Sequence, residues 1–232
     1  MPRKIVQNLL HAALMECCSP SVVERIASHV QCIAAARAAE NDLHAFAAKD
    51  PASRGSVQNI AFGYSSYKAV LHYRLAHAIL DMAALDGDPG REIESAATLV
   101  SARGKLLSGA EIHPRCHIGR RFVLDHGWGT VIGETSQIGD DCYLLGGVVL
   151  GATGISANPS GKRHPTLGNR AQVGAFTRIF GDIVIGDDVF ISPHCVITED
   201  IPSDSIVTLK SVLQLTRKRK SQRLPATLLD IS

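Results

Sequence analysis

Aromatic residues are scarce in this chain of 232 residues, where they make up 5% of the sequence and include a single tryptophan. That scarcity is typical of a core in which small aliphatic side chains pack in layers. Long apolar runs are also missing: no stretch reaches the roughly 18 residues needed to cross a bilayer, so no membrane span is expected. The formal net charge is only +2, which gives no strong attraction to nucleic acid or to a membrane surface.

Cysteine pairs with the spacing of a metal or redox motif are absent as well, because none of the six cysteines forms a C-x-x-C pair. Cys116, Cys142 and Cys195 share one phase of a repeat described below and are expected to be buried, reduced thiols without a disulfide. The first residues carry charges at Arg3 and Lys4, and polar residues interrupt the apolar stretch that follows. This pattern does not match a secretory signal, so the protein is predicted to be cytoplasmic.

The most regular feature of the sequence is an aliphatic residue at every sixth position. A period of six fits neither a helix nor a long strand, and is typical of the hexapeptide β-helix, in which very short strands alternate with tight turns. Three hexads make one circuit of a three-sided prism, so every eighteenth residue stacks on its predecessor and the aliphatic side chain points inward. The 13 positions are Ile112, Ile118, Leu124, Ile132, Ile138, Leu144, Leu150, Leu167, Val173, Ile179, Ile185, Ile191 and Ile197.

Two further patterns accompany these aliphatic positions. A glycine directly follows seven of them and is expected to tolerate the bend at a corner of the prism. Two residues before each of them, from Ala110 to Cys195, the side chain is mostly small or β-branched, as a crowded corner needs. The alternative, a set of ordinary short antiparallel strands, is disfavoured because chance seldom holds one phase through six consecutive hexads.

The repeat is interrupted twice. The first interruption adds two residues to one hexad, in the segment 125–129. The second is a loop of residues 152–166, rich in Gly, Ser, Asn and Pro, which ends near Arg163 and His164. Because loops on a rigid scaffold often carry binding and catalytic residues, both interruptions are candidate sites.

The chain is predicted to consist of an α-helical domain at 1–107, a β-helix at 108–202 and a C-terminal tail at 203–232. The spacing of apolar residues in the tail, from Val207 to Leu215, is roughly helical. The basic run at 217–220 is interpreted as a solvated surface and not as a nucleic-acid site.

Within the first 107 residues, Ser21 and Glu24 have the spacing of a capping box, which predicts a helix start there. Two longer helices are predicted at 64–85 and 92–107, and a turn is predicted at 86–90. The Asp50-Pro51 pair marks a boundary, since the residue before a proline avoids the α region.

Six short motifs follow one another along the predicted β-helix: Glu111–Pro114, Ile118–Arg120, Leu124–His126, Val131–Thr135, Leu150–Gly154 and Arg163–Pro165. In content and order they resemble serine O-acetyltransferase, the hexapeptide-repeat enzyme that starts cysteine biosynthesis. A looser resemblance extends through the helical domain at Asp50–Ala52 and Tyr73–His77. The resemblance implies a left-handed parallel β-helix and the transfer of acetyl from acetyl-CoA to the hydroxyl of L-serine, giving O-acetyl-L-serine, with no metal.

The resemblance also assigns the acid–base pair. A serine hydroxyl needs a base as it attacks a thioester, and histidine is suited to this because its ordinary pKa of about 6.5 lies near working pH. His126 matches the family's base. Its orienting carboxylate is an aspartate in the family, and Glu111 stands there in this chain, one methylene longer.

Substrate and cofactor contacts follow from the same resemblance. Asp50 and Asp125 would hold the ammonium of the amino acid, while Arg163 and His164 would meet its carboxylate and hydroxyl. His164 would belong to the loop of a neighbouring subunit. Contacts to acetyl-CoA would come from Gly151, Ala152, Thr153, Gly154 and Ala175. Phe176 departs from the small residues that the family tends to have along the pantetheine groove.

A homotrimer, or a dimer of trimers, is expected because flat prism faces suit packing around a threefold axis. Docking to O-acetylserine sulfhydrylase is not expected, since the chain ends in Ser232 and not in the terminal isoleucine of the family. Three alternatives stay open: another small hydroxy-amino acid as acceptor, a catalytically silent trimeric scaffold, and a metal enzyme resembling γ-carbonic anhydrase. The histidines available to the last do not have its spacing.

Overall fold

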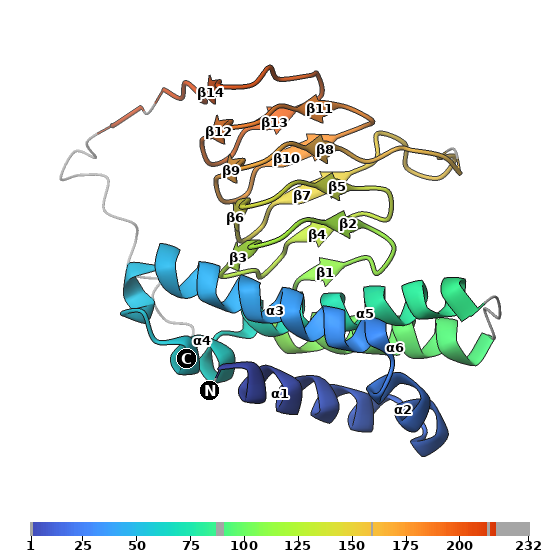
Figure 1. Cartoon of the computed structure of the whole chain (residues 1–232). Coiled ribbons are helices and arrows are strands. Elements are labelled where there is room, and N and C mark those ends of the chain that lie inside the picture. The colour runs from blue at the N-terminus through green and yellow to red at the C-terminus, as the bar shows by residue number, and fades with distance from the viewer. Residues whose placement is uncertain (1, 87–90, 159, 213, 217–232) are drawn as a thin grey trace, which may run out of the picture.

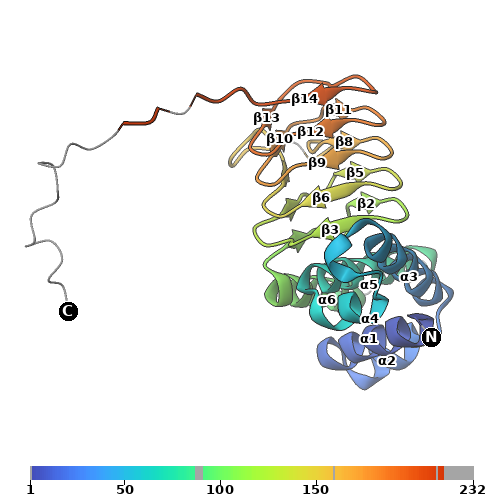
Figure 2. The same ribbon diagram turned by 90° about the vertical axis from the view of Figure 1, so that its left-hand side faces the viewer.

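The computed structural model describes residues 2–86, 91–158, 160–212 and 214–216, and consists of a helical region on which a β-helix stands (Figure 1). Figure 2 shows the same coil from the side, with its first turn resting on the helices. The helical elements are α1 (Pro2–Cys17), α2 (Pro20–Ala27), α3 (Val30–Lys49), the 3₁₀ helix η1 (Pro51–Ser53), α4 (Val57–Gly63), α5 (Ser65–Asp86) and α6 (Arg91–Ser108).

The two long helices predicted at 64–85 and 92–107 are confirmed as α5 and α6. The predicted capping box is wrong: Ser19 is the N-cap of α2, Pro20 occupies its first position, and Ser21 therefore lies inside the helix. Most of the predicted turn at 86–90 falls outside the described residues. In the described part of the chain, no helix is long and apolar enough to span a membrane.

In the described residues, fourteen short strands form three parallel sheets, one on each side of the prism. Sheet A has the order β1-β4-β7-β10-β13, sheet B the order β11-β8-β5-β2, and sheet C the order β14-β12-β9-β6-β3. The strands are β1 (Glu111–Ile112), β2 (His117–Ile118), β3 (Val123–Asp125), β4 (Val131–Ile132), β5 (Gln137–Ile138), β6 (Tyr143–Leu145), β7 (Val149–Gly151), β8 (Thr166–Leu167), β9 (Gln172–Val173), β10 (Arg178–Phe180), β11 (Val184–Ile185), β12 (Phe190–Ile191), β13 (Val196–Ile197) and β14 (Ile206–Val207).

The period of six predicted the core of this coil correctly. All 13 aliphatic positions are buried, and all but Ile183 of the residues two positions earlier are buried as well. Where the repeat is regular, stacked residues lie 18 apart, as Ile132 lies beneath Leu150. The turn at 125–129 lengthens this interval, so that Leu124 lies beneath Leu144, and the long loop lengthens it further without disturbing the register of the strands above.

The glycines after the aliphatic residues have a different role from the one predicted. At Gly119 and Gly139 the φ angle is not positive, so a bend does not demand glycine there. An added Cβ on Gly119 would instead lie 2.6 Å from the carbonyl carbon of Gly139, one turn higher. Successive turns of the backbone therefore approach too closely for a side chain at these corners.

A buried polar network joins the helical region to the first turn of the coil. Arg74 on α5 donates to the Asp42 carboxylate on α3 (Nε to Oδ2, 2.8 Å) and to the carbonyl oxygens of Ile118 and Gly119, each at 2.5 Å. Asp42 Oδ1 also accepts from the backbone N–H of Phe122 at 2.9 Å. Since both ends of this network are buried, the helices and the coil are held in one fixed arrangement.

The C-terminal tail does not form the helix that its spacing predicted. Ile206 and Val207 instead pair with β12 as the last strand, β14, and the described residues beyond them form neither helix nor strand. The basic run at 217–220 lies outside the described residues. All six cysteines are free, and Cys116, Cys142 and Cys195 are buried in the corner phase.

Candidate functional site

A pocket of about 350 Å³ lies where the helical region meets the first turn of the coil. It brings together three residues singled out from the sequence, Asp50, Asp125 and His126, although Asp50 comes from the helical region and the other two from the coil. Its remaining lining residues are Ala52, Gly63, Tyr64, Ser65 and Ser66. A pocket of this size suits a small polar molecule.

Asp50 is fixed at the junction of two helices. It ends α3 as C-cap and starts η1 as N-cap, with Oδ1 accepting from the N–H of Ala52 at 2.8 Å. Its other oxygen, Oδ2, accepts from the hydroxyl of Tyr64 at 2.9 Å. The proline at position 51 stops α3 at this point, because its ring cannot continue a helix, and the carboxylate is thereby left at the mouth of the pocket.

His126 is displayed by the first interruption of the repeat. After β3 the chain makes a turn at 125–129 in which His126, Gly127 and Gly129 all have positive φ. Two hydrogen bonds close the turn, from Gly127 N to Asp125 O at 2.8 Å and from Trp128 N to His126 O at 2.9 Å. The His126 side chain is 82% exposed, with Nε2 3.9 Å from Asp125 Oδ2. The imidazole is therefore free to meet a substrate.

Asp125 is much less exposed, at 16%, and is held from the turn above. Its Oδ2 accepts from the hydroxyl of Tyr143 on β6 at 2.9 Å. Burial and this bond to a carboxylate both raise the pKa of Tyr143, so the hydroxyl keeps its proton and donates. The pocket thus contains two carboxylates and one exposed histidine, a combination able to bind an ammonium group and accept a proton.

Arg163 and His164 form a second cluster, at the base of the long loop. The guanidinium of Arg163 pairs with Glu134, and this bond lowers the pKa of the glutamate. His164 is buried, and its Nδ1 lies 2.9 Å from the hydroxyl of Thr135. Burial, and then the nearby cations, lower the pKa of His164. Its ring lies so close to Gly133 that a Cβ there would overlap it.

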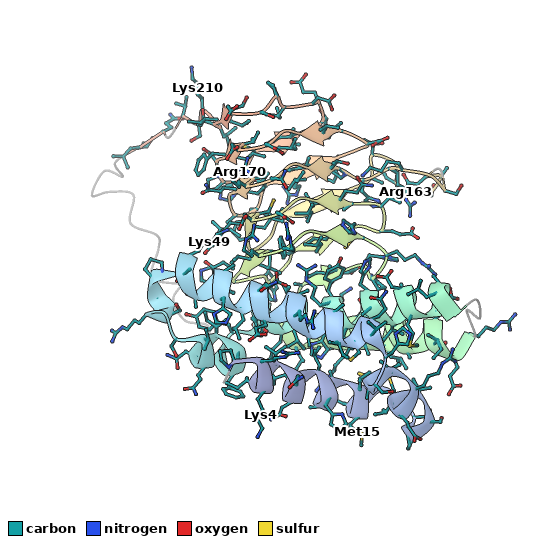
Figure 3. The ribbon with its side chains drawn as sticks, viewed as in Figure 1. Lys4, Met15, Lys49, Arg163, Arg170 and Lys210 are labelled. Carbon is teal, nitrogen blue, oxygen red and sulfur yellow. The ribbon has the colours of Figure 1, made fainter. Side chains whose placement is uncertain are left out.

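The two clusters lie apart within one chain. Asp50 and His126 line the pocket, where the chain passes from sheet C to sheet A, whereas Arg163 and His164 lie at the corner between sheets A and B. Figure 3 shows Arg163 on one side of the coil and Lys49, the neighbour of Asp50, on the other. Residues that the sequence analysis assigned to one substrate are therefore not brought together within this chain.

Glu111 lies outside the pocket. Its Oε2 accepts from Lys105 Nζ on α6 at 2.5 Å, and its side chain is 49% exposed at a groove of about 850 Å³ between α6 and the start of the coil. Its backbone N–H nevertheless donates to Thr130 O at 2.9 Å, directly after the turn that carries His126. Among the described hydrogen bonds and ion pairs, none joins Glu111 to His126.

The expected acetyl-CoA contacts lie on two corners. Gly151, Ala152, Thr153 and Gly154 begin the long loop where it leaves β7, and an added Cβ on Gly151 would lie 2.8 Å from the ring of Phe180. Ala175 stands on the same corner as His126, two turns higher. Beside it, Phe176 packs against Gly147 and stacks on the ring of His194 at 5.4 Å between centroids.

Two residues of the site were not predicted from the sequence: Tyr64 and Tyr143, whose hydroxyls donate to the two aspartates of the pocket. A signal for Tyr143 was available: the two-residue insertion places it opposite Val123, so its outward side chain shares a face with Asp125. No local pattern pointed to Tyr64. No group of three or more His, Cys, Asp or Glu side chains in the described ranges is arranged to hold a metal ion.

Several known proteins resemble this chain in sequence. Residues 164–199 match the family model described as bacterial transferase hexapeptide (six repeats). The chain is 40% identical over 171 residues to the serine acetyltransferase of Helicobacter pylori strain ATCC 700392 / 26695, a match that covers 74% of this chain and 92% of the relative. It is 36% identical over 171 residues to that of Bacillus subtilis strain 168, covering 74% and 73% of the two chains.

Solved structures give the same result. Serine acetyltransferase isoform 3 from Entamoeba histolytica, in complex with cysteine, superposes with a TM-score of 0.72 at 29% identity, over 99% of this chain and 75% of that one. The soybean serine acetyltransferase complexed with serine gives 0.71 at 26% identity, over 86% and 79%. On this identity and coverage, the chain belongs to the serine acetyltransferase family and is an acyltransferase.

Proposed function

We propose that His126 is the general base of an acetyl transfer from acetyl-CoA to the hydroxyl of L-serine, and that Asp50 and Asp125 hold the ammonium group of the substrate. The observation that carries the proposal is the pocket, which places two carboxylates beside an exposed histidine. The serine complex of the soybean relative supports a serine site in this fold.

The reaction can be balanced with the groups in this pocket. As His126 takes the hydroxyl proton, the serine oxygen forms a bond to the thioester carbonyl carbon and the carbon–sulfur bond breaks. The proton then passes from the imidazolium to the departing thiolate. The products are O-acetyl-L-serine and CoA. Asp125 Oδ2, 3.9 Å from Nε2 of His126, attracts the imidazolium that forms during the transfer.

The carboxylate of the substrate requires a cation, and neither lysine nor arginine is among the described residues that line the pocket. Arg163 is the candidate, but it lies at another corner of the same prism. A neighbouring subunit would bring its own Arg163 and His164 to the mouth of the pocket, and a closed trimer would do so three times by symmetry. We therefore propose that the active enzyme is a homotrimer or a larger assembly of trimers.

Glu111 is the proposed orienting carboxylate. In this chain it is engaged by Lys105, and its backbone is bonded to the segment that follows His126. Reaching the imidazole would require the Glu111 side chain to leave Lys105, a change that assembly or substrate binding could drive because the pair is half-exposed and therefore weak.

The proposal is tested by thiol release from acetyl-CoA with L-serine as acceptor. His126→Ala should lower kcat by about 10²–10⁴-fold, the usual contribution of a general base. The matched control is His11→Ala, because His11 is an exposed histidine on α1 that does not line the pocket. Near-normal turnover by His126→Ala would remove His126 as base. Faster release with L-homoserine than with L-serine would keep the mechanism and change the acceptor.

A further inference from the structure

Both aspartates of the pocket accept a hydrogen bond from a tyrosine. Tyr64 donates to Asp50 Oδ2 and Tyr143 donates to Asp125 Oδ2, each at 2.9 Å. The tyrosines come from unrelated elements, since Tyr64 is the C-cap of α4 and Tyr143 lies on β6. Two separate segments of the chain therefore provide the same kind of contact to the same pocket.

Both rings are held by packing that does not involve the aspartates. The ring of Tyr64 meets the buried ring of Phe46 edge-on, with centroids 5.4 Å apart. Tyr143 packs against the apolar core of the helical region and stands opposite Val123, one strand away from Asp125. The packing of each ring thus fixes the direction of its hydroxyl. Because the hydroxyl cannot move with the carboxylate, the hydrogen bond holds the carboxylate in one orientation.

The electrostatics of the pocket explain why such donors are needed. Asp50 and Asp125 present two carboxylates to one small pocket, where repulsion between like charges favours rotation of one of them out of the pocket. A hydroxyl that donates to a carboxylate holds that carboxylate in place against this repulsion. In turn, the bond to Asp50 raises the pKa of Tyr64, so this hydroxyl stays protonated as well.

We propose that Tyr64 and Tyr143 are positioning residues that hold the two carboxylates aimed at the ammonium group of the amino-acid substrate. This inference rests on the proposed function of the pocket. Neither tyrosine takes part in the chemistry. Their loss should therefore weaken binding of the amino acid while leaving the acyl donor unaffected.

The test is Tyr143→Phe, which removes only the hydroxyl. The KM for L-serine should rise by about tenfold, as expected for a hydrogen bond to a charged group, while the KM for acetyl-CoA changes by less than about twofold. The inhibition constant of 3-hydroxypropionate, which has the hydroxyl and carboxylate of serine but no ammonium, should also change by less than about twofold. Tyr64→Phe should behave in the same way.

Tyr67→Phe is the matched control. Tyr67 is buried, and its hydroxyl donates to the backbone carbonyl of Ala39 at 3.0 Å, away from both aspartates. Tyr67→Phe should leave the L-serine KM unchanged, whatever it does to the melting temperature. If the Tyr143 hydroxyl had only a structural role, Tyr143→Phe would likewise lower the melting temperature and leave the L-serine KM unchanged. Equal effects of Tyr143→Phe on L-serine and on 3-hydroxypropionate would overturn the inference.

Asp125→Asn separates failure of the inference from failure of the proposed site. If Asp125→Asn raises the L-serine KM but Tyr143→Phe does not, the pocket binds serine and the positioning role is wrong. If Asp125→Asn itself leaves the L-serine KM unchanged, the pocket is not the ammonium site and both proposals fall. Both proposals are supported if the L-serine KM rises in Asp125→Asn and in Tyr143→Phe while the acetyl-CoA KM stays unchanged.

Discussion

Replacing Asp42 by alanine should be among the most damaging single changes in this protein. The carboxylate is 1% exposed, and its partner Arg74 is 8% exposed. The substitution leaves a buried guanidinium without its counter-ion and the N–H of Phe122 without its acceptor. Breaking a buried ion pair in this way typically costs about 3–5 kcal/mol of unfolding free energy.

The expected shift in melting temperature follows from the length of the chain. With 232 residues, each kcal/mol corresponds to about 2–4 °C. Asp42→Ala should therefore lower the melting temperature by roughly 6–20 °C, measured by far-ultraviolet circular dichroism. The carbonyl oxygens of Ile118 and Gly119 still accept from Arg74, which places the result nearer the lower end of this range.

The control is Asp81→Ala, which removes a half-exposed carboxylate 3.8 Å from His77 on the same helix. Exposed pairs of this kind contribute about 0–1 kcal/mol, so its melting temperature should move by only a few degrees. A shift no larger in Asp42→Ala than in Asp81→Ala would show that the buried network does not hold the helices to the coil. Replacing Asp42 and Arg74 together by apolar residues should recover part of the loss, because no unpaired charge remains.

Two further predictions concern the base of the long loop. Gly133→Ala should displace the His164 ring, which an added Cβ would overlap, and lower turnover by about tenfold or more in the thiol-release assay, whereas Gly161→Ala, with open space around it, should be neutral. Burial lowers the pKa of His164, so its imidazole is protonated more readily in the unfolded chain than in the folded one. The contribution of His164 to stability is therefore fully present above about pH 6.5 and is lost as the pH falls through the folded pKa. The melting temperature of His164→Gln should accordingly fall less between pH 7 and 5 than that of the wild type, and equal slopes would contradict this reasoning.

The sequence predicted the coil well because its core is strictly periodic. Once Ile112, Ile118 and Leu124 define an inward phase, every later member of the phase meets the same surroundings, and no long-range information is needed. The helical region lacks such a repeat. Ser21 and Glu24 have the spacing of a capping box, but the helix begins earlier. Proline is favoured at the first position of a helix, so Pro20 occupies that position and Ser19 becomes the N-cap.

The site was predicted in part, for a related reason. Asp125 and His126 stand together in one interruption of the repeat, and the structure places them together. The contact of Asp50 with Tyr64 depends on how α3, η1 and α4 pack against each other, and the sequence contains no repeat that would predict this packing. The separation of Arg163 from His126 within one chain follows from the corner that each loop leaves, and it fits the expectation that the loop of His164 serves a neighbouring subunit.

The two interruptions of the repeat lengthen the chain without lengthening the coil. The strands above the long loop stack in the same register as those below it, and the added residues leave the prism at a corner. A corner of this coil is thus a point at which residues can be gained or lost while every layer of the core keeps its place. A loop that carries new binding or catalytic residues can therefore be added at one corner without any change in the packing of the core.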